Sequence, residues 1–447
     1  MESRPNSLKG TMSSDLSIRQ ESAAPQSASA HLYSSKTPGP ASSSAAGIGP
    51  VGTQPDEIHK PWLAIAAIIV VAIALWPGIV SVGPILTSVI SEFHLTHAAA
   101  SLLTTIPDLL MGLLALPTPW LARRFGRDPV ILCALALLTA SIAGRAFATD
   151  TAILLLSTAG VGAGIAVSGA LIAGFVKASF PTKAAMLMGI YATALSFGST
   201  LSAAATGPIA ATNISGWRLA SGVWSLLGLF AVLAWLGISI RERRLRVVDP
   251  VVPPRTLLPL RNPTAWLVAI FFAFDNFLFY AVLSWTAPMY REYGLTTSVA
   301  GLILASFTFA FMCANPVFGW LSKSDDRRGW LAACAILAAA SLIGMAIAPM
   351  LAPFVFVPLC AFGLGGGFTL GMTLPLDNTH SVEEANVWNA FVLTVGYLIA
   401  ASGPLLVGAI RDRAGDFRPS IWLLVAVSAG MLLVTPFLRP HHHAVEK

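Results

Sequence analysis

The stretch LPTPWLARRFGRDPV (Leu116–Val130) lies between two long apolar runs and carries three arginines, Arg123, Arg124 and Arg127, next to Asp128. A connection this short predicts a tight hairpin between two membrane-spanning helices, because it leaves no room for a domain linker. Short loops rich in Lys and Arg mark the cytoplasmic side of a bilayer. The hairpin therefore orients every other predicted span.

A second connection of the same kind follows 200 positions later. Trp320-Leu321 repeats Trp120-Leu121, and SKSDDRRG (Ser322–Gly329) again separates two apolar runs. Matching features at a fixed offset are expected of a duplicated membrane bundle. The sequence therefore predicts two related halves.

The composition is that of an integral membrane protein. Of the 447 residues, 55% are hydrophobic and 11% charged, whereas soluble domains carry about 25% charged residues. The net charge of +6 does not indicate a nucleic-acid partner, because the Lys and Arg residues lie in short loops between apolar runs. The four cysteines have no metal-binding spacing, and no GxxxxGK[ST] motif indicates a nucleotide-driven pump. We expect no metal, no cofactor and no nucleic acid.

Apolar runs of about 20 to 25 residues predict helices, since a β-barrel would show roughly ten-residue alternating strands. We predict twelve spans: 62–88, 98–120, 129–149, 152–176, 184–208, 217–240, 264–288, 297–321, 330–350, 353–376, 386–410 and 420–438. Most loop cations fall on the hairpin side, so both termini are expected in the cytoplasm. Arg411, Arg413 and Arg418 are the exception on the other side.

The predicted domain organisation follows from these spans. Residues 1–60 are rich in Ser, Ala, Pro and Gly, and we expect a disordered tail, with a transit peptide as the alternative. The longest connection is basic and rich in proline, and it divides the spans equally. The expected parts are a cytoplasmic tail (1–60), an N-terminal six-helix bundle (61–240), a cytoplasmic linker loop (241–262), a C-terminal six-helix bundle (263–439) and a short C-terminal tail (440–447).

Two six-helix halves, a long central loop and a basic hairpin resemble the major facilitator superfamily. The hairpin is similar to that superfamily's G-x-x-x-D-R-x-G-R-[RK] motif at Arg123, Gly126 and Arg127, while Pro117 and Ala122 replace its Gly and Asp. Finer matches resemble the cyanate/2-nitroimidazole transporter branch (CynX/NimT type) over about residues 70–440. They are SVGPIL (Ser81–Leu86), LLTTIPDLLMG (Leu102–Gly112), Phe180-Pro181, NFLFYAVLSWTAPMY (Asn276–Tyr290) and GLGGGFTLGMTLPLD (Gly363–Asp377).

One departure from the branch bears on the solute. Trp76 stands where members of the branch commonly have an arginine that could pair with an anion. A cyanate-like anion thus loses its obvious partner, which makes such an anion a less favoured solute than a nitroimidazole or another small organic compound. The resemblance implies a transporter of a small solute and leaves the solute open.

Span 7 carries the clearest candidate binding residues. Asn276 and Tyr280 are four residues apart and share one helix face, with Phe279 beside them. An apolar wall with a few placed polar groups is typical of small-molecule sites. We predict that Trp76, Asn276, Phe279 and Tyr280 bind substrate. In the alternative, Asn276 bridges to a neighbouring helix and Trp76 packs against lipid or core.

Two acids lie deep within predicted spans. An ionisable residue at a helix centre costs about 2.5–3.5 kcal/mol on insertion scales, so each is a functional candidate. Asp108 in span 2 and Asp275 in span 7 lie near the midplane and are candidates for proton coupling. The alternative is a packing carboxyl that hydrogen-bonds Ser or Thr. All eight histidines lie in tails, loops or span edges, so we do not expect a buried histidine relay.

Other residues are predicted to move or pack helices. The resemblance implies that Arg123, Arg124, Arg127 and Asp128 latch the cytoplasmic side, or they simply determine topology. Arg145, near the outer end of span 3, is a candidate gate or partner of Asp108, with a snorkelling surface arginine as the alternative. Small residues let helices approach closely, and the glycines expected to do so, rather than to contact solute directly, are Gly162, Gly164, Gly365, Gly366 and Gly367.

The sequence thus predicts an all-α integral membrane protein with twelve transmembrane helices in two pseudo-symmetric six-helix bundles. We expect a monomer in the plasma (inner) membrane that moves a small solute by alternating access around spans 1, 4, 7 and 10. A membrane sensor that kept the fold without moving anything is the alternative. No nucleophile–base pattern or metal spacing favours an enzyme.

Overall fold

The computed structural model describes residues 61–180, 183–212, 216–242, 258–322, 326–379 and 382–439. The predicted tails, 1–60 and 440–447, and residues 243–257 of the predicted linker lie outside the described residues. All regular elements within the described ranges are helical, and twelve spans are long and apolar enough to cross a membrane. The predicted number and order of spans are confirmed.

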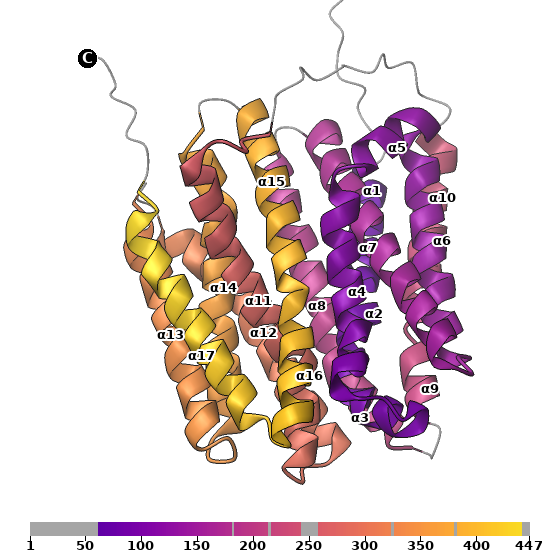
Figure 1. Ribbon diagram of the computed structural model, residues 1–447. Coiled ribbons are helices and arrows are strands. Elements are labelled where there is room, and N and C mark those ends of the chain that lie inside the picture. The colour runs from indigo at the N-terminus through magenta and orange to yellow at the C-terminus, as the bar shows by residue number, and fades with distance from the viewer. Residues whose placement is uncertain are drawn as a thin grey trace, which may run out of the picture. The chain divides into compact units, whose positions relative to one another are not determined.

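The first six spans are built from ten helices (Figure 1). Spans 1 and 6 are each divided, and a short helix follows span 2. The helices are α1 (Pro61–Leu75), α2 (Pro77–Val80), α3 (Val82–Phe93), α4 (His97–Ala115), α5 (Thr118–Phe125), α6 (Arg127–Ala146), α7 (Thr151–Ser179), α8 (Ala184–Ala210), α9 (Gly216–Gly222) and α10 (Ser225–Glu242).

The second six spans follow the same plan, with a division in span 11. The helices are α11 (Pro263–Glu292), α12 (Thr297–Leu321), α13 (Arg328–Ile347), α14 (Pro353–Asp377), α15 (Val382–Ala400), α16 (Ser402–Ala414) and α17 (Arg418–Val434), and α17 ends in a 3-10 turn, η2 (Thr435–Phe437).

The offset of 200 residues between the halves recurs in the backbone. Thr96 caps the start of α4 by accepting a hydrogen bond from Ala99 N, and Thr296 caps α12 through Val299 N in the same way. Two residues before each cap, the chain takes a positive φ, 51° at His94 and 93° at Gly294. The same turn and the same cap therefore begin span 2 and span 8.

The hairpin between spans 2 and 3 is longer than the sequence predicted. Span 2 ends at Ala115, and Pro117, which has no N–H to donate, is the N-cap of the separate helix α5. At Gly126 the chain turns into α6 with φ of 87°, a conformation that glycine adopts without strain. The basic residues thus lie on a short helix and the turn after it.

The two halves meet along helices that line the centre of the molecule. In the first half, α4 packs against α15 and α16, and α8 packs against α12. Helix α11 also touches α3 across this boundary and is buried along most of its length. Among the twelve described spans, span 7 is therefore the most deeply buried, and its side chains face other helices.

The five predicted packing glycines each lie against a neighbouring helix. A methyl group at Gly162 would lie 2.5 Å from Cα of Pro107 in α4, and one at Gly164 would lie 2.8 Å from the carbonyl oxygen of Ala134 in α6. In α14, Gly365, Gly366 and Gly367 approach α12, α13 and α11 as closely. The glycines therefore set the distances between these helices.

We expect Gly162→Ala to lower stability by about 1–3 kcal/mol, because a methyl group at this position overpacks the contact between α7 and α4. The midpoint of thermal unfolding in detergent measures the effect. Gly174→Ala is the matched control, since it lies on the same helix with no atom within 4 Å of the added carbon. Equal midpoints for the two variants would contradict the packing role.

Candidate functional site

A cavity of about 100 Å³ lies at the boundary between the two halves. Its walls come from the break in span 1 and from α8, α11, α12, α14 and α15. The first half contributes Trp76, Ala192, Leu195, Ser196 and Ser199; the second contributes Asn276, Phe279, Tyr280, Thr308, Phe311, Asn315, Phe368 and Tyr397. A concave site between two lobes is where a small ligand is expected to bind.

All four residues predicted to bind substrate lie on this wall: Trp76, Asn276, Phe279 and Tyr280. The break in span 1 puts Trp76 there, because α1 ends at Leu75 and α2 begins at Pro77. The indole ring of Trp76 stacks on Tyr280, with centroids 6.2 Å apart and an interplanar angle of 18°. Trp76 lies on the cavity wall and also packs against the buried core, as the core half of the alternative expected. Substrate binding by the four residues stays a prediction.

Seven aromatic rings contact one another in a closed series, and all of them except Phe272 line the cavity. Starting from Trp76, each ring contacts the next at centroid distances between 4.7 and 6.4 Å, and the last returns to Trp76. The order of the series is Trp76, Tyr280, Tyr397, Phe272, Phe368, Phe311 and Phe279. Offset and edge-to-face contacts of this kind hold rings in fixed orientations, so the cavity has stiff apolar walls.

The polar groups on the wall are uncharged amides and hydroxyls. The amide nitrogen of Asn276 donates to the carbonyl of Phe272 at 2.9 Å, and its Oδ1 has no donor among the described residues. Asn315 Oδ1 lies 2.9 Å from the hydroxyl of Thr369. Within the described part of the chain, no Asp, Glu, Lys, Arg or His lines the cavity. The site can orient a polar solute but offers no counter-ion.

The sequence missed the contribution of span 8. Phe311 and Asn315 are four residues apart on α12 and face the cavity, as Asn276 and Tyr280 do on α11. An asparagine inside an apolar span was the signal that could have found Asn315. Span 4, predicted to line the site, does not do so, because the glycines of α7 hold it against α4 and α6.

The two predicted proton carriers lie behind the cavity wall. Asp108 and Asp275 are fully buried, and neither oxygen of either carboxyl has a hydrogen-bond partner among the described residues. The alternative in which they hydrogen-bond Ser or Thr is therefore wrong. Asp275 packs against Gly367, where an added Cβ would collide with its Oδ1. An ionised carboxylate without donors is costly in an apolar interior, so proton exchange at either group requires a rearrangement around it.

Arg145 does not lie at the protein surface. Its side chain is buried, with Nη1 donating to the carbonyl of Gly78 at 2.7 Å and Nη2 lying 3.4 Å from Thr158 Oγ1. It forms no hydrogen bond or ion pair with Asp108, whose carboxyl lacks any partner among the described residues. The surface alternative and the pairing with Asp108 are both wrong, and gating by Arg145 stays a prediction.

The hairpin residues divide into two groups. Arg123 and Arg124 are exposed, and Arg124 lies over the ring of Trp120 at 5.9 Å. Arg127 pairs with Asp128 at 3.1 Å and lies 4.4 Å above the ring of Phe175 on α7. The contact of Arg127 with Phe175 holds the hairpin against α7; a latching role for the four residues stays a prediction.

Comparison with known proteins agrees with this architecture. The family model of the Major Facilitator Superfamily matches residues 62–386 and 265–447. The chain belongs to the major facilitator superfamily, a family of transporters. Among solved structures, a bacterial homolog of the human lysosomal transporter Spinster in an inward-facing and occupied conformation has a TM-score of 0.70 at 17% identity, covering 85% of this chain and 96% of that one. A D-xylose-proton symporter has a TM-score of 0.66 at 14% identity, covering 84% and 96%.

Curated relatives place the chain in the predicted branch. It is 30% identical to the 2-nitroimidazole transporter of Escherichia coli K12, covering 79% of this chain and 89% of the relative. It is 27% identical to the cyanate transport protein CynX of the same organism, covering 82% and 95%. An uncharacterized transporter of Bacillus subtilis, YycB, is 29% identical, covering 83% and 91%. The resemblance to the CynX/NimT type is confirmed.

Proposed function

We propose that this protein moves a small, uncharged ring compound of the nitroimidazole type across the plasma (inner) membrane by alternating access. The observation that carries the proposal is the aromatic cavity between the halves. Rocking of two lobes around a central site is how folds built from repeats transport solutes. The relatives at 27–30% identity include proteins named for the transport of cyanate and 2-nitroimidazole.

The chemistry of the wall favours an uncharged solute. A water needs at least about 10–15 Å³ of cavity volume. The cavity of about 100 Å³ therefore admits roughly ten non-hydrogen atoms or fewer. Aromatic faces stack well on a planar ring, and the amides and hydroxyls can orient its polar edge. An anion would be stripped of water with no cation to receive it, since Trp76 occupies the position of the branch's arginine. We therefore favour a ring compound over cyanate.

The proposal includes topology and energy coupling. Both termini are placed in the cytoplasm, because the hairpins of both halves carry the basic residues. Asp275 directly precedes Asn276, which lines the cavity, so movement of α11 changes the surroundings of both. A proton moving down the membrane potential supplies about 2.3 kcal/mol per 100 mV. Proton binding at Asp275, or at Asp108, would drive transport with that energy.

Trp76→Ala should weaken binding of 2-nitroimidazole tenfold or more, because an aromatic wall contributes on the order of 1–3 kcal/mol to a bound ring. Titration calorimetry on the purified protein measures the dissociation constant. Trp422→Ala, an exposed tryptophan on α17, is the matched control and should bind as the wild type does. Unchanged affinity in Trp76→Ala, or tighter binding of cyanate than of the ring compound, contradicts the proposed site.

Asp275→Asn should abolish accumulation driven by a pH gradient while sparing solute exchange, because the substituted residue cannot carry a proton. Sealed vesicles with radiolabelled 2-nitroimidazole measure both activities, and a protonophore should collapse accumulation in the wild type. Asp150→Asn is the control, since Asp150 is an exposed helix cap and asparagine caps equally well. Wild-type pH dependence in Asp275→Asn would remove Asp275 from the mechanism; binding without flux would favour the sensor alternative.

A further inference from the structure

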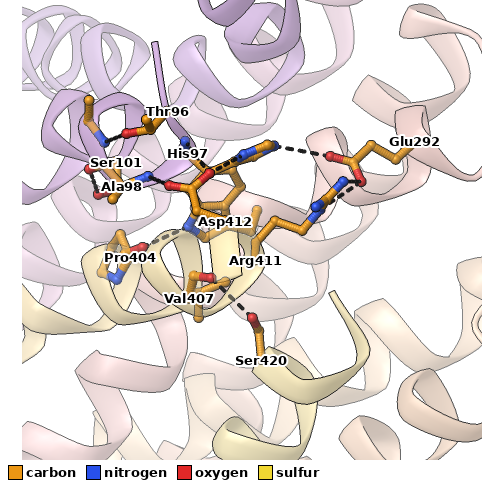
Figure 2. A network of polar contacts seen from close by, with 12 residues as sticks. Thr96, His97, Ala98, Ser101, Glu292, Pro404, Val407, Arg411, Asp412 and Ser420 are labelled. Carbon is orange, nitrogen blue, oxygen red and sulfur yellow. Dashed lines mark hydrogen bonds and ion pairs between the residues drawn. The ribbon is translucent and has the colours of Figure 1, made fainter. Parts of the chain in front are cut away.

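A cluster of charged side chains joins the two halves (Figure 2). It lies where α4 begins and α16 ends, at the end of the bundle opposite α5 (Figure 1). His97 is the first residue of α4 in the first half. Its Nδ1 lies 2.7 Å from Asp412 Oδ1 on α16, and its Nε2 lies 3.2 Å from Glu292 Oε1 on α11. Each ring nitrogen of one histidine therefore contacts an acid of the other half.

Both acids are held in the ionised form by other donors. Asp412 accepts hydrogen bonds from the backbone amides of His97 and Ala98, at 2.9 and 2.8 Å, at the positive end of α4. Glu292 accepts from Nε and Nη2 of Arg411, at 2.9 and 2.7 Å. Ionised carboxylates only accept hydrogen bonds. Because both partners of the ring are acceptors, both ring nitrogens must carry a hydrogen.

His97 is therefore an imidazolium in this state. Its positive charge, with that of Arg411, balances Asp412 and Glu292. Without the proton, one ring nitrogen would present a lone pair to a carboxylate, and the cluster would keep an uncompensated negative charge between the halves. Contacts between like-charged or acceptor groups at this distance are unfavourable.

The surroundings of His97 leave few other groups to compensate the charge. The rings of Trp285 and Phe417 lie 5.6 and 6.1 Å from the imidazole and cover it. From α16 and α11, the charged groups that face His97 are Asp412 and Glu292, with Arg411 behind Glu292. Asp416 and Arg418, beside Phe417, form no hydrogen bond or ion pair with the ring within the described residues. The His97 side chain is 21% exposed, so water can reach it.

We infer that His97 is a proton-binding site whose occupancy holds the two halves together at the face opposite the basic hairpins. This inference rests on the proposed alternating access, which requires that face to open and close. A bound proton stabilises the closed arrangement through two hydrogen bonds. Its loss, as pH rises, removes one of these two hydrogen bonds and weakens the contact of α4 with α11 and α16, while the bonds from the His97 and Ala98 amides to Asp412 remain. The site differs from Asp275 and Asp108, because it lies at the rim where water can deliver the proton directly.

Distances between spin labels on the two halves test the site without knowledge of the solute. Labels on Thr149→Cys and Leu351→Cys occupy exposed loops at the same face, in a chain whose four native cysteines are alanine. Raising the pH from about 5.5 to about 8.5, across the range in which histidine titrates, should increase the ratio of long to short distances. Loss of a charge-assisted hydrogen bond predicts an increase of about tenfold or more.

His97→Asn should show the long distance at every pH, and its ratio should not respond to pH. His94→Asn is the matched control, because His94 lies three residues away and asparagine tolerates its positive φ. In His94→Asn, the ratio of long to short distances should change with pH as it does in the background chain. Wild-type pH dependence in His97→Asn would overturn the proton site.

A third variant distinguishes a failure of the proton site from a failure of the proposed alternating access. Asp412→Asn combined with Glu292→Gln removes the charge partners and should open this face independently of pH. If this variant shows the long distance while the distances in the background chain do not change with pH, the proton site is contradicted and alternating access stands. If no variant lengthens the distance at any pH, opening at this face fails, and the proposed function fails with it.

Discussion

In the hydrocarbon core of a bilayer, every backbone amide and carbonyl must find its hydrogen-bond partner within the protein. This constraint makes the chain a set of helices, and it makes each break in a helix conspicuous. Span 1 breaks around Trp76, and Arg145 donates to the carbonyl of Gly78. Span 11 breaks at Ala401, whose carbonyl accepts from Thr105 Oγ1 at 3.0 Å. At both breaks, a side chain from another helix supplies a hydrogen bond to the backbone.

The same constraint explains where the cavity lies. Trp76 at the first break and Tyr397, one turn before the second, both line its wall. A broken span can turn a side chain inward that a continuous helix would direct elsewhere. Among the described residues, no charged side chain lines the cavity: the ion pairs lie at the two faces, the buried acids lie behind the wall, and Arg145 is buried beside Gly78. The centre is thus suited to a solute without charge.

The sequence predicted the membrane class, the number of spans, the family and the four wall residues because these depend on local signals. Apolar length identifies a span, and the i, i+4 spacing places Asn276 and Tyr280 on one face. The positions of Arg145 and of span 4 could not be predicted, because they depend on which helices become neighbours. Spacing within one helix says nothing about whether Arg145 meets Asp108, lipid or the carbonyl of Gly78.

His97 shows a second limit of sequence reasoning. A histidine at a span edge gives no local signal, since its importance depends on two acids more than 190 positions away. Comparison of the two repeated halves shows where they differ at this contact. Glu92 and Glu292 are 200 positions apart, yet Glu92 binds Arg218 within its own half while Glu292 binds His97 across the boundary. The turn and the cap are repeated in both halves because each must begin a helix. Among the described residues, the contact of His97 with two acids across the boundary has no counterpart in the second half, because position 297 holds a threonine where position 97 holds a histidine. Duplication thus accounts for the scaffold, and the departure from it places a titratable link where the two halves meet.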